Sequence, residues 1–147
     1  MIRDAPPASV LLDTCAIIWL VNAEPLPASV IQTIRQAGRA DGVYVSTASA
    51  WEIGMLSRPR PGRRPMPQFL PDPKTWFNRL MAMPGIKEAP ITPDIAIDAS
   101  HLPGDLHADP MDRLIVATAR HLGMPIVTSD RKIIAYAESG FVRVIPC

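Results

Sequence analysis

Short apolar runs alternate with helical patterns along this sequence, and the alternation restricts its fold more than any other feature. The runs expected to form strands are residues 10–13, 43–46, 89–92, 125–128 and 141–145. Helical patterns separate or follow them, over residues 15–21, 28–38, 47–56, 74–83, 93–102, 110–122 and 131–140. Strands that alternate with helices are typical of a parallel sheet covered by helices on both faces. We therefore predict an α/β fold around a central parallel sheet of about five strands.

Two stretches lie outside this alternation. Residues 1–9, which include Pro6 and Pro7, are expected to form an extended lead-in. Residues 57–73 contain repeated prolines among arginines, so we expect a loop with no regular element there. The length of 147 residues suits one domain spanning 1–147, large enough to bury about two thirds of its unfolded surface.

Charge and cysteine content exclude several classes of protein. The formal net charge of +1 gives no overall field for nucleic acid or membrane, so a polyanion must be held locally. No apolar run approaches about 18 residues and no basic leader precedes one, so we expect a cytoplasmic protein with no membrane partner. Cys15 and Cys147 lack metal-binding spacing, and Cys15 is expected to be a buried free thiol.

Two carboxylates lie three residues apart at the start of the helix expected over 110–122. Pro110 fits the first helical position, which makes Asp109 the natural N-cap and Asp112 the third helical residue. Residues three apart share a helix face, so both acids can face one cleft. The alternative is a cap, in which Asp109 accepts backbone N–H bonds and Asp112 reaches back as in a capping box.

Four acids are expected to meet at one edge of the sheet. Asp13 and Asp130 each follow an apolar strand, while Glu52 and Asp112 each lie near the start of a helix. Ligands collect beyond the carboxyl ends of such strands. Because two unit charges 4 Å apart repel by about 4 kcal/mol at an effective dielectric near 20, a cation should accompany them. Oxygen ligands without cysteine favour Mg²⁺ or Mn²⁺ over zinc, and such an ion suits hydrolysis of a phosphodiester.

Each member of this set also has a purely structural explanation. Glu52 follows Ser49 at capping-box spacing, and Asp130 has the position of an N-cap. Asp13 is harder to explain in this way, because a charge at the end of a buried strand requires a partner. His107 is either a loop residue or a group that orients a ligand or contacts substrate. Trp19 and Trp51 are expected in the core.

The loop over 57–73 supplies the local positive charge that the overall balance lacks. Its arginines would suit phosphate contacts, although a solvated loop without a role is equally consistent with the sequence. The candidate substrate-binding residues are Arg58, Arg60, Arg63 and Arg64.

Four motifs occur in one order along almost the whole chain. They are Leu11-Leu12-Asp13-Thr14, Ser49-Ala50-Trp51-Glu52-Ile53, His107-Ala108-Asp109-Pro110-Met111-Asp112-Arg113 with Leu114-Ile115-Val116-Ala117 after it, and Val127-Thr128-Ser129-Asp130. In these residues the chain resembles the PIN-domain ribonucleases, and specifically the VapC-like toxins of bacterial toxin–antitoxin pairs. The proline- and arginine-rich loop and the residues before Val10 depart from the family pattern.

The resemblance implies a fold, a site and partners. The fold would be a small PIN-like α/β/α sandwich. Asp13, Glu52, Asp112 and Asp130 would be the catalytic metal cluster for Mg²⁺ or Mn²⁺, with Asp109 as an accessory acid or cap. The activity would be a metal-dependent endoribonuclease acting on RNA as the toxin of the pair. A homodimer and a cognate antitoxin across the active-site groove would be its partners.

Other α/β families fit the sequence less well. A haloacid-dehalogenase-like phosphatase needs a second Asp where Cys15 stands, and a receiver domain needs a paired acid and a later Lys that are missing. A dinucleotide-binding protein would have a glycine-rich first turn, which Asp13-Thr14-Cys15-Ala16 lacks. The open alternative is a catalytically silent PIN-like module that acts only through a protein or RNA partner.

Overall fold

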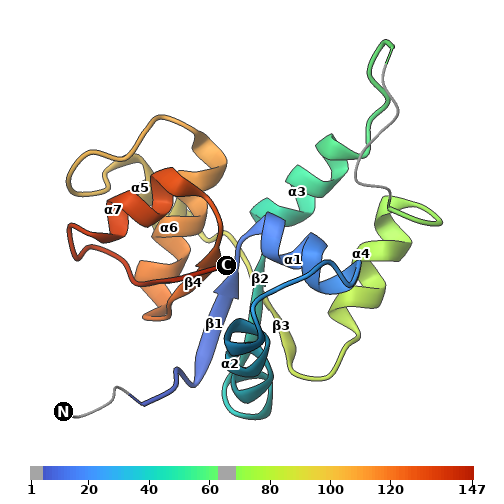
Figure 1. Cartoon of the computed structure of the whole chain (residues 1–147). Helices are drawn as coiled ribbons and strands as arrows, with labels where there is room; N and C mark the ends of the chain where they lie inside the picture. The colour runs from blue at the N-terminus through green and yellow to red at the C-terminus, as the bar shows by residue number, and fades with distance from the viewer. Residues whose placement is uncertain (1–4, 63–68) are drawn as a thin grey trace.

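A single parallel sheet forms the centre of the computed structural model, which describes residues 5–62 and 69–147 (Figure 1). Its order is β3-β2-β1-β4-β5, and every neighbouring pair is parallel. The strands are β1 (Ser9–Leu12), β2 (Gly42–Ser46), β3 (Ile86–Ala89), β4 (Ile126–Thr128) and β5 (Val144–Pro146). The predicted α/β fold with a five-stranded parallel sheet is therefore confirmed.

Helices cover both faces of this sheet. They are α1 (Thr14–Val21), α2 (Ala28–Arg39), α3 (Thr47–Leu56), α4 (Pro73–Met81), α5 (Pro93–Ser100), α6 (Pro110–Leu122) and α7 (Arg131–Ala137). In Figure 1, α5, α6 and α7 lie on one side of β1, and α1, α2 and α4 lie on the other. None of the helices in the described part of the chain is both long and apolar enough to span a membrane.

The central strand β1 shows why the sheet needs cover on both faces. Leu11 packs into the core formed with α5, α6 and α7, whereas Val10 and Leu12 pack into the core formed with α1, α2 and α4. All three side chains are fully buried. A strand buried on both faces has a continuous apolar run instead of an alternating one, and this is the pattern that predicted it.

Two strands and one aromatic residue differ from the prediction. The strand expected at 89–92 is β3, three residues earlier, because this edge strand exposes Lys87 and Glu88 and has no apolar run. The last strand begins at Val144, after the turn around Gly140. Trp51 is not in the core: its side chain is 60% exposed on α3. Trp19 is partly buried against the core, as expected.

Candidate metal centre

The two central strands each deliver one acid to the same edge of the sheet. β1 and β4 are neighbours, with Leu12 opposite Val127, so the residues that follow them leave the sheet side by side. Asp13 is the N-cap of α1, and Asp130 is the N-cap of α7. The hydroxyl of Thr128 donates to Asp13 Oδ2 at 2.7 Å and accepts the N–H of Asp130 at 2.9 Å. One side chain therefore ties the two acids together.

The Asp13 carboxylate is buried, and each of its oxygens accepts a hydrogen bond. Its Oδ1 accepts the Thr14 N–H at 2.8 Å, and its Oδ2 accepts the Thr128 hydroxyl. Burial raises the pKa of Asp13, the two hydrogen bonds lower it, and the charge of Asp130 raises it again. The neighbouring Cys15 thiol is free, as predicted, but only partly buried, 3.3 Å from Ser129 Oγ.

Glu52 comes to the same edge on α3. The first turn of this helix is joined to α1 because Thr14 Oγ1 donates to Ser49 Oγ at 3.0 Å. Burial raises the pKa of Glu52, the Thr14 hydroxyl lowers it, and the charges of Asp13, Asp109 and Asp130 raise it. A capping box with Ser49 is excluded, since the N-cap of α3 is Ser46 and Ser49 lies inside the helix.

Helix α6 begins and ends as its sequence predicts. The N-cap is Asp109, whose Oδ1 accepts the N–H groups of Met111 at 2.9 Å and Asp112 at 3.4 Å. Gly123 ends the helix in the left-handed conformation, with a φ of 68°. The capping alternative is therefore half right, because Asp109 caps the helix while the Asp112 carboxylate faces His107.

Asp112 has the most perturbed carboxylate of the group. Burial and then the charges of Asp130, Asp109, Asp13 and Glu52 raise its pKa from 3.8 to about 7. The electrostatic effect of one carboxylate on the pKa of another decreases with the distance between them. The charges of Asp13, Glu52, Asp109 and Asp130 thus act on Asp112, but of these acids only Asp130 belongs, with Asp112 and His107, to the group of metal-binding atoms that lie within 4.8 Å of one another in the described residues.

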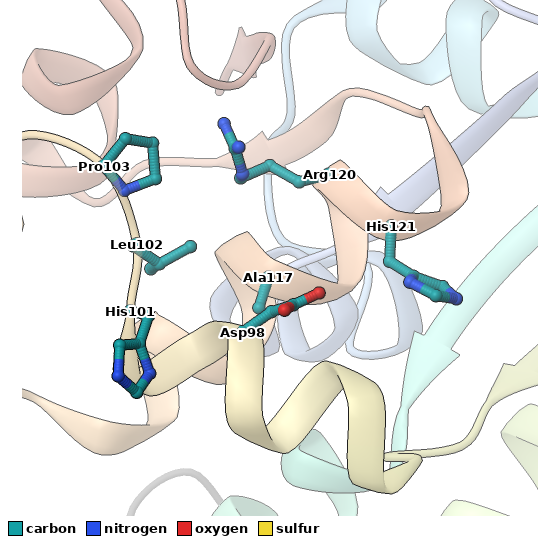
Figure 2. Close-up of a pocket in the computed structure, with 7 residues that line it drawn as sticks. All are labelled: Asp98, His101, Leu102, Pro103, Ala117, Arg120 and His121. Carbon is teal, nitrogen blue, oxygen red and sulfur yellow. The ribbon is translucent and has the colours of Figure 1, made fainter.

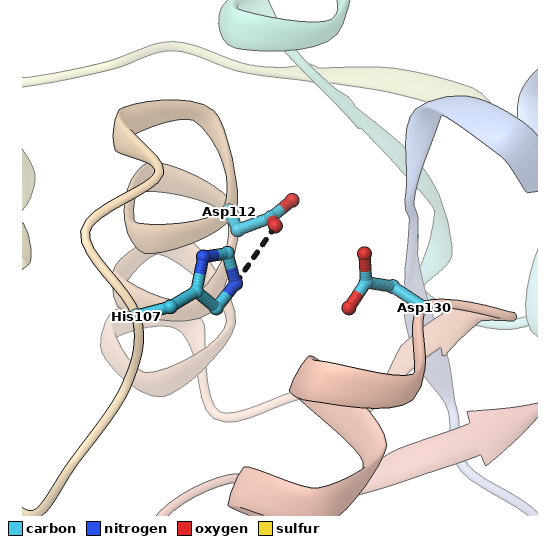
Figure 3. A group of neighbouring side chains, drawn as sticks. All are labelled: His107, Asp112 and Asp130. Atoms are coloured by element: carbon cyan, nitrogen blue, oxygen red, sulfur yellow. Dashed lines mark ion pairs between the residues drawn. The ribbon is translucent and has the colours of Figure 1, made fainter.

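His107, which the sequence left open between a loop residue and a group that orients a ligand or contacts substrate, lies at the site. Its Nε2 lies 3.0 Å from Asp112 Oδ2, and the atoms of His107, Asp112 and Asp130 that can bind a metal lie within 4.8 Å of one another (Figure 3). Its Nδ1 accepts the Asp109 N–H at 3.3 Å. The available signal was its position two residues before an N-cap, but a histidine before a helix is commonly a loop residue.

Two of the candidate substrate-binding arginines are exposed after α3, whereas Arg113 is engaged inside the fold. Arg58 is exposed just after α3 and Arg60 is exposed two residues further on, whereas Arg63 and Arg64 lie outside the described residues. Arg113, next to Asp112, points inward: its Nε donates to Ala99 O at 2.8 Å and its Nη1 to Leu106 O at 2.9 Å. Arg113 therefore holds the loop that carries His107.

A separate hollow of about 240 Å³ lies between α5 and α6 (Figure 2). It is lined by Asp98, His101, Leu102, Pro103, Ala117, Arg120 and His121. None of the acids at the sheet edge contributes to it, so it is not part of the candidate metal centre.

Comparison with known proteins identifies the family of this chain. The model of the PIN domain family matches residues 10–139. Ribonuclease VapC22 of Mycobacterium tuberculosis is 31% identical over 125 residues, which cover 85% of this chain and 89% of that protein.

Solved structures show the same fold at lower identity. VapBC2 from Rickettsia felis, bound to a DNA fragment from their promoter, matches with a TM-score of 0.66 at 12% identity, over 94% of this chain and 98% of that one. VapBC-5 from Mycobacterium tuberculosis, a member of the VapBC family of toxin–antitoxin systems, matches with a TM-score of 0.58 at 18% identity, over 96% and 100%. The chain belongs to the PIN-domain family, and within it to the VapC ribonucleases.

Proposed function

We propose that this chain is a metal-dependent endoribonuclease that hydrolyses RNA phosphodiester bonds and acts as the toxin of a toxin–antitoxin pair. The observation that carries the proposal is the electrostatic coupling of Asp112 to Asp13, Glu52 and Asp130, all near the carboxyl edge of the sheet: burial, and then the charges of these acids and of Asp109, raise the pKa of Asp112 to about 7. Repulsion between these carboxylates does not stabilise the folded state of the metal-free protein. It is typical of a site that a cation completes.

The donor atoms fit a hard divalent ion. Carboxylate oxygens dominate the group, which favours Mg²⁺ or Mn²⁺ over zinc. We propose that Asp13, Glu52, Asp112 and Asp130 hold this ion as the catalytic residues. Asp109 is proposed as an accessory acid, because its Oδ1 is already engaged by backbone N–H groups while its charge still acts on Asp112.

The protein's own residues orient these groups. Thr14 and Thr128 fix both oxygens of Asp13, and the backbone of α7 fixes Asp130 through the N–H groups of Lys132 and Ile133. A bound Mg²⁺ or Mn²⁺ would supply an activated water and stabilise the charge on the phosphoryl oxygens. Rigid ligands hold reacting groups in line without further loss of entropy.

The substrate path is proposed along the end of α3. Arg58 and Arg60 are exposed beyond Glu52 on the same segment, and their charges suit the phosphates of RNA. We also propose Arg63 and Arg64 as substrate-binding residues, although they lie outside the residues that the structure describes.

We also propose a cognate antitoxin and a homodimer as partners. The support is the likeness to solved VapBC complexes, which are toxin–antitoxin systems. An antitoxin segment that covers the acid cluster would block access of RNA to it. We further propose that residues 1–147 form one domain.

Cleavage of RNA by the purified protein tests the proposal. Structured bacterial RNA is incubated with Mg²⁺, with Mn²⁺ and with chelator, beside an Asp112→Asn variant purified in the same way to control for contaminating nuclease. We expect cleavage that requires metal and disappears in the variant. If no RNA is cleaved and neither ion raises the melting temperature, the chain is instead a silent binding module that acts through its partner.

A further inference from the structure

His107 is held firmly beside the acid cluster. Arg113 of α6 donates to Ala99 O and Leu106 O, and Leu106 is itself buried. The loop before α6 is therefore attached to the helix that carries Asp112. Asp112 lies on α6, and the loop with His107 is attached to the same helix through Arg113. The fold therefore sets the 3.0 Å separation of His107 Nε2 and Asp112 Oδ2.

The hydrogen bond at Nδ1 decides which ring nitrogen carries the proton. The Asp109 N–H donates to His107 Nδ1, which must present a lone pair, so the proton of the neutral ring is on Nε2. Nε2 is then a donor and has no lone pair for a metal. The opposite tautomer would set an Nδ1–H against the Asp109 N–H, two donors facing each other.

The Asp112 carboxylate has fewer hydrogen-bond donors than the carboxylates of Asp13, Asp130 and Asp109. Both oxygens of Asp13 accept hydrogen bonds, and one oxygen of Asp130 and of Asp109 accepts backbone N–H groups. Among the described residues, the Asp112 carboxylate accepts no hydrogen bond, and His107 Nε2 lies 3.0 Å from its Oδ2. This nitrogen is buried and makes no hydrogen bond, although Asp112 Oδ2 lies only 3.0 Å away. A small rotation of either side chain satisfies a buried donor that is otherwise costly.

We infer that His107 is a positioning residue for Asp112: its Nε2–H holds Asp112 Oδ2, leaves Oδ1 for the metal ion, and is not itself a ligand. The inference rests on the metal site of the proposed function. Groups that hydrogen-bond to metal ligands typically change metal affinity by about 10- to 100-fold when they are removed. Imidazole ligands, in contrast, increase the preference for Co²⁺ over Mn²⁺.

Two variants separate positioning from ligation. His107→Leu removes the donor at similar size, whereas His107→Gln retains an N–H group near the position of Nε2. The affinities of wild type and both variants for Mn²⁺ and for Co²⁺ are measured by calorimetric titration, with thermal unfolding in chelator as the check of folding. We expect His107→Leu to bind both ions about 10-fold or more weakly at an unchanged Co²⁺/Mn²⁺ ratio, and His107→Gln to recover most of the loss.

Other outcomes overturn the inference. A Co²⁺/Mn²⁺ ratio that falls in both variants would make His107 a ligand. Unchanged affinities in both variants would leave it without a role at the metal. If the wild-type protein binds neither ion, both the proposed metal site and this inference are wrong. A falling Co²⁺/Mn²⁺ ratio or unchanged affinities would instead contradict only the role of His107.

Discussion

One hydroxyl group connects the two acids that leave the centre of the sheet. Thr128 donates to Asp13 Oδ2 and accepts the Asp130 N–H, and its side chain is fully buried. Nothing in a sequence distinguishes this threonine from any other β-branched residue in a strand. Its role follows from the parallel pairing of β1 with β4, which sets it beside Asp13.

Replacing Thr128 by valine should destabilise the protein. The Thr128→Val variant keeps the shape of the side chain but leaves Asp13 Oδ2 buried without its donor, which typically costs about 1–3 kcal/mol of unfolding free energy. Urea unfolding near neutral pH measures the change. Thr128→Ser, which keeps the hydroxyl, should lose much less, and a Val variant as stable as wild type would contradict the role given to this hydrogen bond.

Neutralising Asp112 should stabilise the metal-free protein while it abolishes cleavage. Asp112→Asn removes a half-buried charge that is repelled by Asp130, Asp109 and other acids of the cluster. We expect a higher melting temperature than wild type in chelator near neutral pH. Asp105→Asn, at an exposed acid of the preceding loop, is the matched control and should change little. A lower melting temperature for Asp112→Asn would show that its charge is structural.

Helices and strands differ in how far their positions depend on nearby residues in the sequence. The bounds of α6 were predictable because Asp109, Pro110 and Gly123 act within a few residues of themselves. β3 was misplaced because an edge strand needs no apolar run. The exposure of Trp51 and the contact of His107 with Asp112 depend on which elements pack nearby, and a local pattern does not contain that information.

The acids were predictable for a different reason. Asp13 and Asp130 follow buried strands, and parallel topology alone brings such positions to one edge. Thr14, Ser49 and Thr128, which hold the acids in place, were not selected, since their hydrogen bonds join α1 to α3 and β1 to β4. The sequence therefore predicts the candidate acids but not the hydrogen bonds that hold them in place.

The segment after α3 should contribute to RNA binding through charge. Replacing Arg58 and Arg60 by alanine removes two phosphate contacts, and each contact contributes about 0.7 to the salt slope for single-stranded nucleic acid. We expect weaker binding of RNA to the catalytically inactive Asp112→Asn background and a slope of log K against log salt that is shallower by about 1.4. The slope is measured by fluorescence anisotropy at several salt concentrations.

A matched pair on another helix controls for the loss of positive charge. Arg35 and Arg39 lie exposed on α2, away from the acid cluster. Their replacement by alanine changes the net charge by the same amount and should leave the slope nearly unchanged. Equal slopes for the two double variants would remove the end of α3 from the substrate path.

The whole molecule places its charged site between two separate apolar cores. One core lies between the sheet and α5, α6 and α7, and the other between the sheet and α1, α2 and α4. The acids come from both sides, on α3 and on α6, and meet beyond the carboxyl ends of the central strands. The cores therefore hold repelling charges together, and the stability of the molecule should depend on whatever neutralises them.

Metal-free protein should accordingly become less stable as pH rises. The folded-state pKa of Asp112 is raised from 3.8 to about 7, so its protonated form is favoured by folding. Its stabilising contribution is complete below pH about 4 and is lost as pH rises through about 7, and Asp13 and Glu52 act in the same direction. In chelator, the melting temperature should be higher at about pH 5 than at about pH 8.

Mg²⁺ or Mn²⁺ should reverse this dependence. A cation competes with protons for the same oxygens, so it binds more tightly as pH rises. Its stabilising effect grows with the ratio of metal concentration to Kd, and it should therefore be large at about pH 8 and small at about pH 5. Differential scanning fluorimetry across this range, with and without metal, measures both effects. The Asp112→Asn variant should flatten the curve in chelator and lose most of the shift with metal. A metal-induced shift that does not vary with pH would mean that the ion binds away from these carboxylates.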